Sequence, residues 1–519
     1  MQIAYDAGSF PGCEPVFIVV DGKNSSNLRR HDPDSPLTGA KPKPSPRNEL
    51  DEMERTQIEV EPEPIQIPKL QMHHMFEKEQ EKIDNMDDER RCANYGVPLL
   101  PEDERHTKRI FFGSMLADEN PELIAAHAIE VYNQYHLIAL VESNTTHSND
   151  PRKMKYGPGS MDARILTESE LFGTTDKTKV VIDYWLEDKP YLYEMSREVE
   201  QRNTIWKIWV EQGMTQRDIG LMADLDEVVS RDFLNALQVC DFPKLRFDPS
   251  QTGENRPSCQ TPKMALAAIQ FDGSPLCIKK LEWYHPDLIL GNCIAGVGDP
   301  TGRVTPVRDI SPEGSDQMTE GSRHHGWGKW DSNNYPQDVK DNNRFPLWDG
   351  RDIREVMGST DNLVNRVRRR GMGKNVYGAA YHLHNWFKDT ETLRHKFATY
   401  GHAEKNARDT PLSDFGDGDI NMMVRCARDL GNDIKIRDDK DPNLYEYYLN
   451  NTVLPEGINT IFSLGGNRPI YFSNRTYVLE RHALLQKMIL DDEAKYGTIY
   501  DEAAILAFEE SKKNQATNE

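Results

Sequence analysis

Short apolar runs alternate with helical patterns between residues 109 and 240, and this alternation constrains the fold more than any other feature of the chain. The apolar runs have the length of strands and occupy residues 109–116, 136–143, 179–186 and 219–223. Helices are expected between and after them, at residues 121–135, at 195–212 and behind a Ser230 cap. Strands that alternate with helices predict right-handed crossovers and a mainly parallel sheet covered on both faces. The fold class is therefore α/β and Rossmann-like.

The rest of the chain divides by composition around this centre. Residues 1–104 are rich in Pro, Glu, Asp and Lys and predict a flexible acidic tail or stem, with one helix near residues 75–91. Residues 105–450 form the expected main domain, in which 263–285 add strands of a mixed or antiparallel extension. Residues 296–352 are dense in Gly, Pro, Asp and Asn and indicate a long loop insertion or an ordered lid. Residues 451–519 are a C-terminal extension with a closing helix.

The overall charge narrows the class of function. With 63 Lys plus Arg against 85 Asp plus Glu, the formal net charge is −22. An acidic surface of this kind argues against an ordinary nucleic-acid binder and against anionic membranes. No run of about 18 apolar residues is present, so no membrane span is visible, and residues near Met1 lack the pattern of a signal peptide.

Neither the cysteines nor the possible glycosylation sites decide in which cellular compartment the protein lies. The seven cysteines have no C-x-x-C spacing, which makes a zinc site improbable by pattern and leaves the pairing of thiols undecided. Triplets of the form N-x-S/T begin at Asn24, Asn144, Asn450 and Asn474, but they acquire glycans only in a secreted protein.

An acidic cluster follows the fourth apolar run. Asp224 and Asp226 are two residues apart, so in extended chain both carboxylates would point the same way at the carboxyl edge of the sheet. Ligands of open α/β sheets bind at that edge, and two carboxylates suit Mn²⁺ or Mg²⁺ beside a diphosphate. Other D-x-D triplets at 32–34, 417–419 and 439–441 lack a preceding apolar run and read as turns or solvated loops.

Three further groups of residues could serve the same site. Glu142 and Asn144 end the second strand, and Arg152 and Lys155 follow closely with cations that could hold phosphates; a solvated loop is the alternative. Arg231 follows the acidic cluster, where it could contact the donor or form a local ion pair with Asp232.

Two histidines alternate in the run 379–387. In a strand, His382 and His384 would share one face, where a neutral imidazole could be a further metal ligand. A histidine packed among aromatic residues is the alternative for each.

Three blocks carry a resemblance to a known family. They are ALVESNTTHSNDPRKMKY (139–156), DIGLMADLDEVVSRD (218–232) and AYHLHNWF (380–387). Together they resemble glycosyltransferase family 17, the family of β-1,4-mannosyl-glycoprotein 4-β-N-acetylglucosaminyltransferase, across roughly residues 105–430. The chain departs from the family pattern at Ala223, where a third acid is frequent, and at Ala380 and Tyr381, which replace a Gly-Trp pair.

The resemblance implies a GT-A-like transferase with an inverting outcome. The donor would be a UDP-sugar, UDP-N-acetylglucosamine above all, and the acceptor a glycan or glycoprotein. Family members are Golgi membrane proteins, which implies the secretory pathway, although no anchor is visible in this sequence. The metal ligands implied are Asp224, Asp226 and His382, which matches the family histidine. The donor-site residues implied are Glu142, Asn144, Arg152, Lys155 and Arg231.

Transfer by single displacement also needs a base for the acceptor hydroxyl. Carboxylates are the expected bases, and the candidates are Glu227, Asp299 and Asp389. A different class of function stays open beside the enzyme, namely a non-catalytic glycan-binding or scaffold protein that keeps the fold and a structural cation. The transferase prediction would fail if Asp224 and Asp226 pointed away from any cavity or were engaged by arginines deep in the interior.

Overall fold

The computed structural model describes residues 3–4, 17–18, 66–147, 150–186, 194–251, 257–260, 262–266, 268–283, 285–298, 347–348, 350–355, 379–399, 411–412, 420, 423–424, 426–427 and 469–497. Contacts divide the chain into two units, Met1–Pro68 and Lys69–Glu519. In the first unit, β1 (Ile3–Ala4) and β2 (Phe17–Ile18) pair in antiparallel fashion. All elements named below belong to the second unit.

The second unit is organised on a six-stranded sheet with the order β5-β4-β3-β6-β11-β8. The strands are β3 (Ile110–Leu116), β4 (Leu137–Ser143), β5 (Lys179–Trp185), β6 (Ile219–Met222), β8 (Met264–Ala265) and β11 (Asp287–Leu290). The first four in spatial order are parallel, while β11 is antiparallel to both β6 and β8. The expected mixed, mainly parallel sheet is confirmed, and all four sequence-predicted strands are in it.

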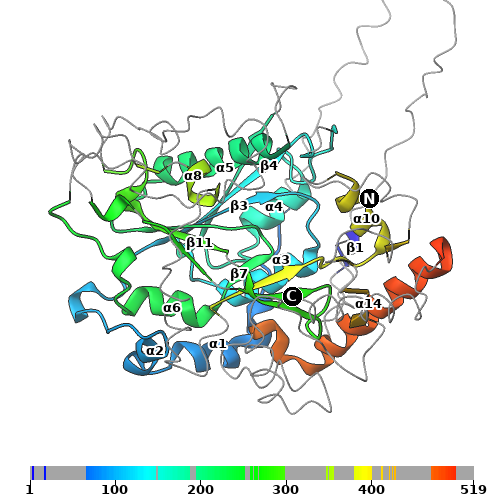
Figure 1. The fold of residues 1–519 in the computed structure, drawn as a ribbon, viewed down its shortest axis with the longest axis horizontal. Coiled ribbons are helices and arrows are strands. Elements are labelled where there is room, and N and C mark those ends of the chain that lie inside the picture. Colours follow the sequence, from blue (N-terminus) through cyan, green and yellow to red (C-terminus); the bar gives the residue numbers. More distant parts are fainter. Residues whose placement is uncertain are drawn as a thin grey trace, which may run out of the picture. The chain divides into compact units, whose positions relative to one another are not determined.

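Helices cover the two faces of this sheet, because its strands bury side chains on both sides (Figure 1). Phe111 joins the core cluster that contains Ile205 and Trp209 of α5 (Glu194–Glu211). The next residue, Phe112, meets His127 of α3 (Pro121–Val131) with ring centroids 5.1 Å apart. Successive residues of β3 thus pack on opposite helices, as the alternation of a strand requires.

Two glycines let α5 approach the sheet closely. Gly113 of β3 and Gly220 of β6 lie under the indole of Trp209, and a Cβ added to Gly220 would come within 2.6 Å of Trp209 Cζ3. Trp209 Nε1 donates a hydrogen bond to the Phe112 carbonyl at 3.1 Å. Glycine in a strand interior commonly marks this kind of close approach.

A second, four-stranded sheet has the order β10-β9-β12-β7. Its strands are β7 (Glu227–Val229), β9 (Ala268–Asp272), β10 (Ile278–Trp283) and β12 (Ala380–His384). One face is apolar: Phe271 of β9 contacts Tyr381 of β12, and η12 (Ile470–Ser473) adds Phe472 with ring centroids 5.1 Å from Phe271. The opposite face carries polar residues, named together the polar face: Glu227, Gln270, Asp272, His382 and His384.

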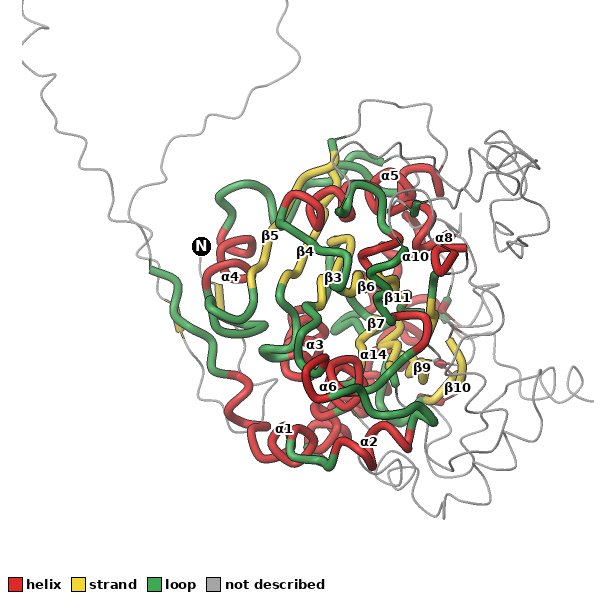
Figure 2. The backbone as a smooth tube through the Cα atoms, turned by 90° about the vertical axis from the view of Figure 1, so that its left-hand side faces the viewer, coloured by secondary structure: helices red, strands yellow, loops and turns green. Residues whose placement is uncertain are grey.

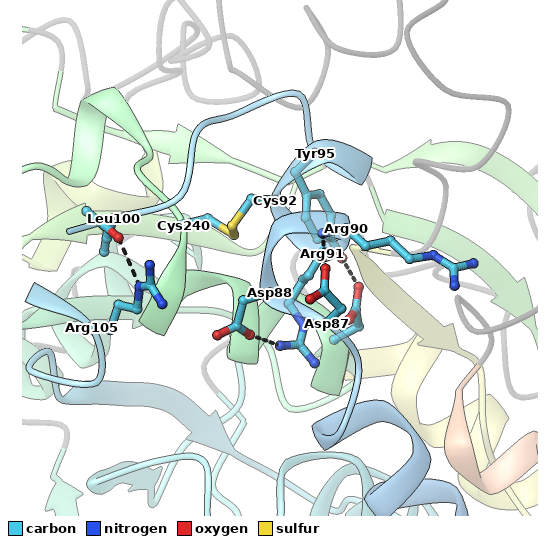
Figure 3. The surroundings of a disulfide bond; sticks show 10 residues. Asp87, Asp88, Arg90, Arg91, Cys92, Tyr95, Leu100, Arg105 and Cys240 are labelled. Carbon is cyan, nitrogen blue, oxygen red and sulfur yellow. Dashed lines mark hydrogen bonds and ion pairs between the residues drawn. A yellow bond between two sulfur atoms is a disulfide. The ribbon is translucent and has the colours of Figure 1, made fainter. Parts of the chain in front are cut away.

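Residues 72–104, which fall in the expected tail, are packed against the domain instead. Helices α1 (Glu77–Asp84) and α2 (Asp88–Asn94) lie against α6 (Arg231–Val239) (Figure 2). A disulfide joins Cys92 to Cys240 (Figure 3). The buried Arg91 donates to Asp232 at 3.0 Å. Polar composition concealed this packing, because only a few apolar residues, among them Phe76, Ile83 and Tyr95, are buried together with Arg91 and Cys92.

The remaining elements complete the second unit. Two more disulfides are Cys259–Cys293 and Cys277–Cys426, and Cys13 lies outside the described residues. The closing helix is confirmed as α14 (Arg475–Tyr496), which is tied to α3 by the buried pair Arg481–Glu122 at 3.1 Å. Other elements are η2 (Met72–Phe76), η3 (Glu102–Glu104), α4 (Met161–Glu168), η4 (Pro243–Leu245), η5 (Pro257–Gln260), η6 (Gly291–Cys293), α8 (Gly350–Glu355) and α10 (Thr390–Thr399).

Some sequence predictions concern residues that lie outside the described part of the chain. Most of the insertion expected at 296–352 lies outside the described residues, as do the alternative D-x-D triplets. Among the described helices, none combines the length and apolar composition that crossing a bilayer requires.

Candidate functional site

The candidate site lies where the spatial order of the parallel strands reverses. The chain passes from β3 to β4 on one side and later returns to β6 on the other side of β3. Ligands of open α/β sheets bind in the crevice outside the carboxyl ends of the strands at such a switch point. Residues 223–226 follow the carboxyl end of β6 directly and therefore occupy this position.

The acidic cluster forms a turn rather than the expected extended segment. The amide of Glu227 donates to the Asp224 carbonyl at 2.9 Å, which closes the turn between β6 and β7. Leu225 is buried between the two aspartates, and its carbonyl lies 2.8 Å from Nδ1 of the buried His127. As a result, Asp224 and Asp226 have different surroundings.

Asp224 lies between two arginines. Its Oδ1 accepts from Arg202 Nη2 of α5 at 2.7 Å, and its Oδ2 accepts from Arg354 Nη2 of α8 at 2.9 Å. Burial alone would raise the pKa of Asp224, but Arg202 and Arg354 outweigh that effect and hold it well below its ordinary value. The side chain is nevertheless 38% exposed, so it does not lie deep in the interior.

Arg354 also organises the buried carboxylates beneath Asp224. Its two terminal nitrogens donate to both oxygens of Glu227 at 2.8 Å, and Nη1 lies 3.3 Å from Asp287 Oδ2. Glu227 additionally accepts from Trp283 Nε1 at 2.7 Å and from the Asp224 amide at 2.9 Å. With four donors on its two oxygens, Glu227 acts as a structural anion, and its expected role as a base stays a prediction that this geometry does not favour.

Asp287 of β11 belongs to the same network of charged side chains around Arg354. Lys263 lies 3.1 Å from its Oδ1, and His285 Nδ1 lies 2.7 Å from its Oδ2. Burial would raise the pKa of Asp287, but the charge of Lys263, followed by His285, lowers it to about 2. Arginines and a lysine thus neutralise the carboxylates of Asp224, Glu227 and Asp287 as a group.

Asp226 faces the second sheet instead. Its Oδ2 lies 3.4 Å from Nε2 of His382, a neighbour that the pairing of β12 with β7 brings beside the turn. Burial would raise the pKa of Asp226, but His382 lowers it by charge and by hydrogen bonding. The sequence-predicted strand and the shared face of the two histidines are confirmed, with the rings of His382 and His384 5.0 Å apart.

The Asp226–His382 pair fits a divalent ion. Neighbouring ligands of an octahedral ion with bonds near 2.1 Å are about 3 Å apart, close to the separation of this oxygen and nitrogen. Within the described part of the chain, no three His, Cys, Asp or Glu side chains converge in the way that a metal site built from protein alone would need. Mg²⁺-type sites with one or two protein ligands take their remaining ligands from water and substrate phosphates.

The block at 142–156 comes together at the same edge of the sheet. Glu142 is buried, and its oxygens accept from Arg152 Nη2 at 3.1 Å and from the backbone amides of Lys155 and Tyr156 at 2.7 and 2.9 Å. Burial raises the pKa of Glu142 despite these donors. Glu142 therefore shapes the basic segment, and Asn144 supports it by accepting from the Arg152 amide at 2.9 Å.

The two cations of this block reach toward the end of β3. Arg152 Nη1 lies 3.4 Å from the Leu116 carbonyl, and Lys155 Nζ donates to the Glu119 carbonyl at 3.0 Å. Arg152 Nε is buried and has no hydrogen-bond partner within the described residues. Burial raises the pKa of Glu119 to about 7, a feature that its place in a polar loop did not reveal in the sequence.

Arg231 and Asp232 hold the N-terminal helices. Arg231 donates from two nitrogens to Asp84 of α1 at 2.8 and 2.7 Å, and its Nη1 donates to the Tyr132 carbonyl at 2.9 Å. Asp232 accepts from Arg91 at 3.0 Å and from the Tyr95 hydroxyl at 2.9 Å. These contacts give both residues structural roles, and a donor role for Arg231 stays a prediction without geometric support.

The other expected bases are placed as follows. Asp389 Oδ1 accepts from the Thr392 amide at 2.7 Å and so caps α10, while Asp299 lies outside the described residues.

Sequence reasoning missed Arg202 and Arg354. Arg202 carried only the spacing of a surface pair with Glu198, and nothing in the sequence near Arg354 linked it to the acidic turn.

Comparison with known proteins gives one match. Residues 68–247 match the family model described as glycosyltransferase family 17. No curated protein and no solved structure matches the chain. The matched segment includes the blocks at 139–156 and 218–232, extends back through α1 and α2, and ends before the block at 380–387.

Proposed function

We propose, from the premise that residues 68–247 are of the glycosyltransferase family 17 type, that this chain is a metal-dependent inverting glycosyltransferase with a GT-A-like fold. The family match itself supports a glycosyltransferase, with a sugar donor and an acceptor. The finer proposal is transfer of N-acetylglucosamine from UDP-N-acetylglucosamine to a hydroxyl of an N-glycan-like acceptor. The observation that carries it is the Asp226–His382 pair at the switch point of the sheet.

The topology supports nucleotide binding at this edge. The parallel order β5-β4-β3-β6 corresponds to one half of a doubly wound sheet, and its carboxyl edge gathers Arg152, Lys155 and the acidic turn. A nucleotide diphosphate laid across this edge would meet the two cations of the 142–156 block at one side. It would meet Asp226 at the other.

Asp226 and His382 would hold Mn²⁺ or Mg²⁺. When bound, such an ion neutralises charge on the diphosphate and acts as a Lewis acid toward the leaving group. Arg202 and Arg354 keep Asp224 ionised, and the buried Glu227 holds the turn through the Asp224 amide. The chain thereby positions Asp226 without leaving two unpaired carboxylates side by side.

The disulfides support an oxidising compartment. Three bridges in the described residues are typical of secreted or lumenal proteins, which agrees with the secretory pathway suggested by the family. The Golgi lumen is the specific proposal. Asn144 lies at the proposed donor edge, so a glycan on it would obstruct donor binding.

The test of the proposed function is coupled binding of metal and donor. UDP should raise the melting temperature in the presence of Mn²⁺, and neither alone should do so to the same extent; at a concentration 100 times the Kd the added stability is about 2.7 kcal/mol. A subsequent screen of UDP-sugars for Mn²⁺-dependent hydrolysis or transfer identifies the sugar. A response to UDP that is the same after removal of all divalent ions would contradict the metal role.

A non-catalytic glycan-binding protein is the second candidate. It is favoured by the engagement of both oxygens of Asp224 with arginines, which leaves one aspartate fewer for a catalytic metal. The two candidates differ in turnover. A chain that binds glycan with a micromolar Kd but neither binds UDP with Mn²⁺ nor hydrolyses any UDP-sugar belongs to this second class.

A further inference from the structure

The polar face of the second sheet contains buried acceptor atoms that the fold leaves unsatisfied. Gln270 and Asp272 alternate along β9 and pair in register with His382 and His384 of β12. Gln270 and Asp272 are each 1% exposed. Within the described residues, Gln270 Oε1 and Asp272 Oδ2 have no hydrogen-bond partner. An unsatisfied buried polar group costs about 1–3 kcal/mol, so these atoms fit a ligand that supplies donors.

Asp272 differs from the carboxylates expected as bases. All four donors around Glu227 come from the protein, and Asp389 caps a helix. Asp272 accepts one hydrogen bond, from Asn385 Nδ2 to Oδ1 at 2.9 Å, while its second oxygen stays unpartnered within the described residues. A base needs an oxygen that is held in place by the protein and is not already occupied by another donor. Within the described residues, Asp272 Oδ2 meets that requirement.

The charges around Asp272 favour a neutral, hydroxylated ligand. Lys279 and Lys396 lie near enough to lower its pKa, together with His382, although burial dominates and raises the pKa. These ammonium groups disfavour a second metal ion at this position. The half-buried Trp283 lies on the same face, with its ring 4.9 Å from that of His382. Two oxygen acceptors beside an aromatic ring suit the hydroxyls and the apolar face of a sugar.

The polar face also continues from the proposed metal pair. Asp226 contacts His382, the ring of His382 lies 5.0 Å from that of His384, and His384 Nδ1 lies 3.6 Å from Asp272 Oδ1. Asp272 is therefore separated from Asp226 by the two histidines. The metal ligand and the base are thus different residues, as the proposed reaction requires, because one carboxylate could not serve both roles.

We propose that the polar face binds the acceptor sugar and that Asp272 Oδ2 accepts the proton of the reacting hydroxyl. This inference rests on the proposed transferase function. The hydroxyl oxygen forms a bond to the anomeric carbon of the donor, and the bond from that carbon to the diphosphate oxygen breaks. Its electron pair leaves with the nucleotide diphosphate, and the proton passes to Asp272 and then to water. Gln270 Oε1 accepts from a neighbouring hydroxyl and orients the ring.

Asp272→Asn is the first test, because it keeps the shape of the side chain and removes the base. With UDP-N-acetylglucosamine, Mn²⁺ and fluorescent N-glycans ending in mannose or in N-acetylglucosamine, kcat should fall by about 10²- to 10⁴-fold. The Mn²⁺-dependent rise in melting temperature with UDP should be the same as in the wild type. Asp491→Asn, a change at an exposed residue of α14, is the matched control and should leave both measurements unchanged.

Gln270→Met is the second test, and it should weaken glycan binding without lowering the stability of the protein. Removal of an unsatisfied buried oxygen should keep or raise the melting temperature, while KM for the glycan rises about 10-fold or more. A purely structural Gln270 would instead lower the melting temperature and leave KM unchanged, which would contradict the subsite even if Asp272→Asn failed to fold.

The outcomes separate this inference from the function on which it rests. Wild-type protein without any Mn²⁺-dependent response to UDP overturns the transferase and the subsite together. Wild-type transfer with an Asp272→Asn variant of equal kcat overturns the base alone. Donor binding without transfer to either class of glycan overturns the assigned acceptor.

Discussion

The two sides of the acidic turn differ sharply although their aspartates are only two residues apart. On the arginine side, Asp224 shares Arg354 with the buried Glu227 and Asp287. On the histidine side, Asp226 faces His382, with Oδ2 3.4 Å from Nε2. The first arrangement stabilises the fold by pairing charges, and the second leaves an oxygen and a nitrogen that a divalent ion could join. Two carboxylates of one short acidic motif can thus have different partners, arginines for Asp224 and a histidine for Asp226.

The largest effect should come from removing the cation at the centre of the arginine side. Arg354→Met leaves the carboxylates of Glu227, Asp287 and Asp224 without their shared partner, and breaking a buried charge network costs about 3–5 kcal/mol. Urea unfolding measures this loss. Lys487→Met is the control, since Lys487 is 72% exposed and pairs with Asp491, which is 60% exposed; it should cost less than about 1 kcal/mol. Equal costs for the two variants would show that the network contributes no special stability.

Acid should weaken the arginine side next. The folded-state pKa of Asp287 is about 2, below its ordinary value of 3.8, so its contribution is present above pH 4 and is lost as the pH falls toward 2. A shift of nearly two units in a fully buried group corresponds to about 2 kcal/mol. The pKa values of Asp224 and Asp226 are lowered as well and act in the same direction.

Unfolding free energies measured between pH 6 and pH 2 test this expectation. In Asp287→Asn, the part of the pH dependence that comes from this residue should disappear, so the curve between pH 4 and pH 2 becomes flatter. An unaltered slope would mean that Asp287 titrates in the folded protein as it does in the unfolded chain.

Asp224→Asn should separate stability from metal binding. The neutral amide loses the charge that pairs with Arg202 and Arg354, and we expect a loss of about 1–3 kcal/mol, typical of a hydrogen bond to a charged group. The Mn²⁺-dependent response to UDP should persist in reduced form. Complete loss of that response with unchanged stability would reverse the roles assigned to the two aspartates.

Asp226→Asn should give the smallest change in stability and the largest change in metal response. Its one described charged partner is His382 at 3.4 Å, so the unfolding free energy should change by less than about 1 kcal/mol. The rise in melting temperature with Mn²⁺ and UDP should be abolished, together with transfer. Asp491→Asn again serves as the control, and an intact Mn²⁺ response in Asp226→Asn would remove this residue from the metal site.

Local patterns predicted the elements that carry the site. The apolar run before Asp224, the Ser230 cap of α6 and the end of α5 before Gly213 are all as expected. The alternation of His382 and His384 also predicted their shared face. These features depend on neighbours along the chain, which is why periodicity and capping residues were sufficient.

Other features depended on partners that are distant in sequence. Polar composition suggested a tail where α1 and α2 pack on α6, because Arg91, Arg231 and the Cys92–Cys240 bridge contribute to that packing beside only a few apolar side chains. Glu142 looked like a ligand residue, yet its oxygens hold the segment that follows it. The sequence around a carboxylate does not predict which distant residue will donate a hydrogen bond to it.

The sequence by itself determined that a strand of a mainly parallel α/β sheet is followed by an acidic cluster, since hydrophobic periodicity and strand length encode that much locally. Tertiary structure alone decided that Asp224 pairs with Arg202 and Arg354 and that Asp226 contacts His382. The physical reason is that the charge state and ligand capacity of a carboxylate depend on the groups within a few ångströms, and packing of α5, α8 and β12 brings those groups from distant parts of the chain.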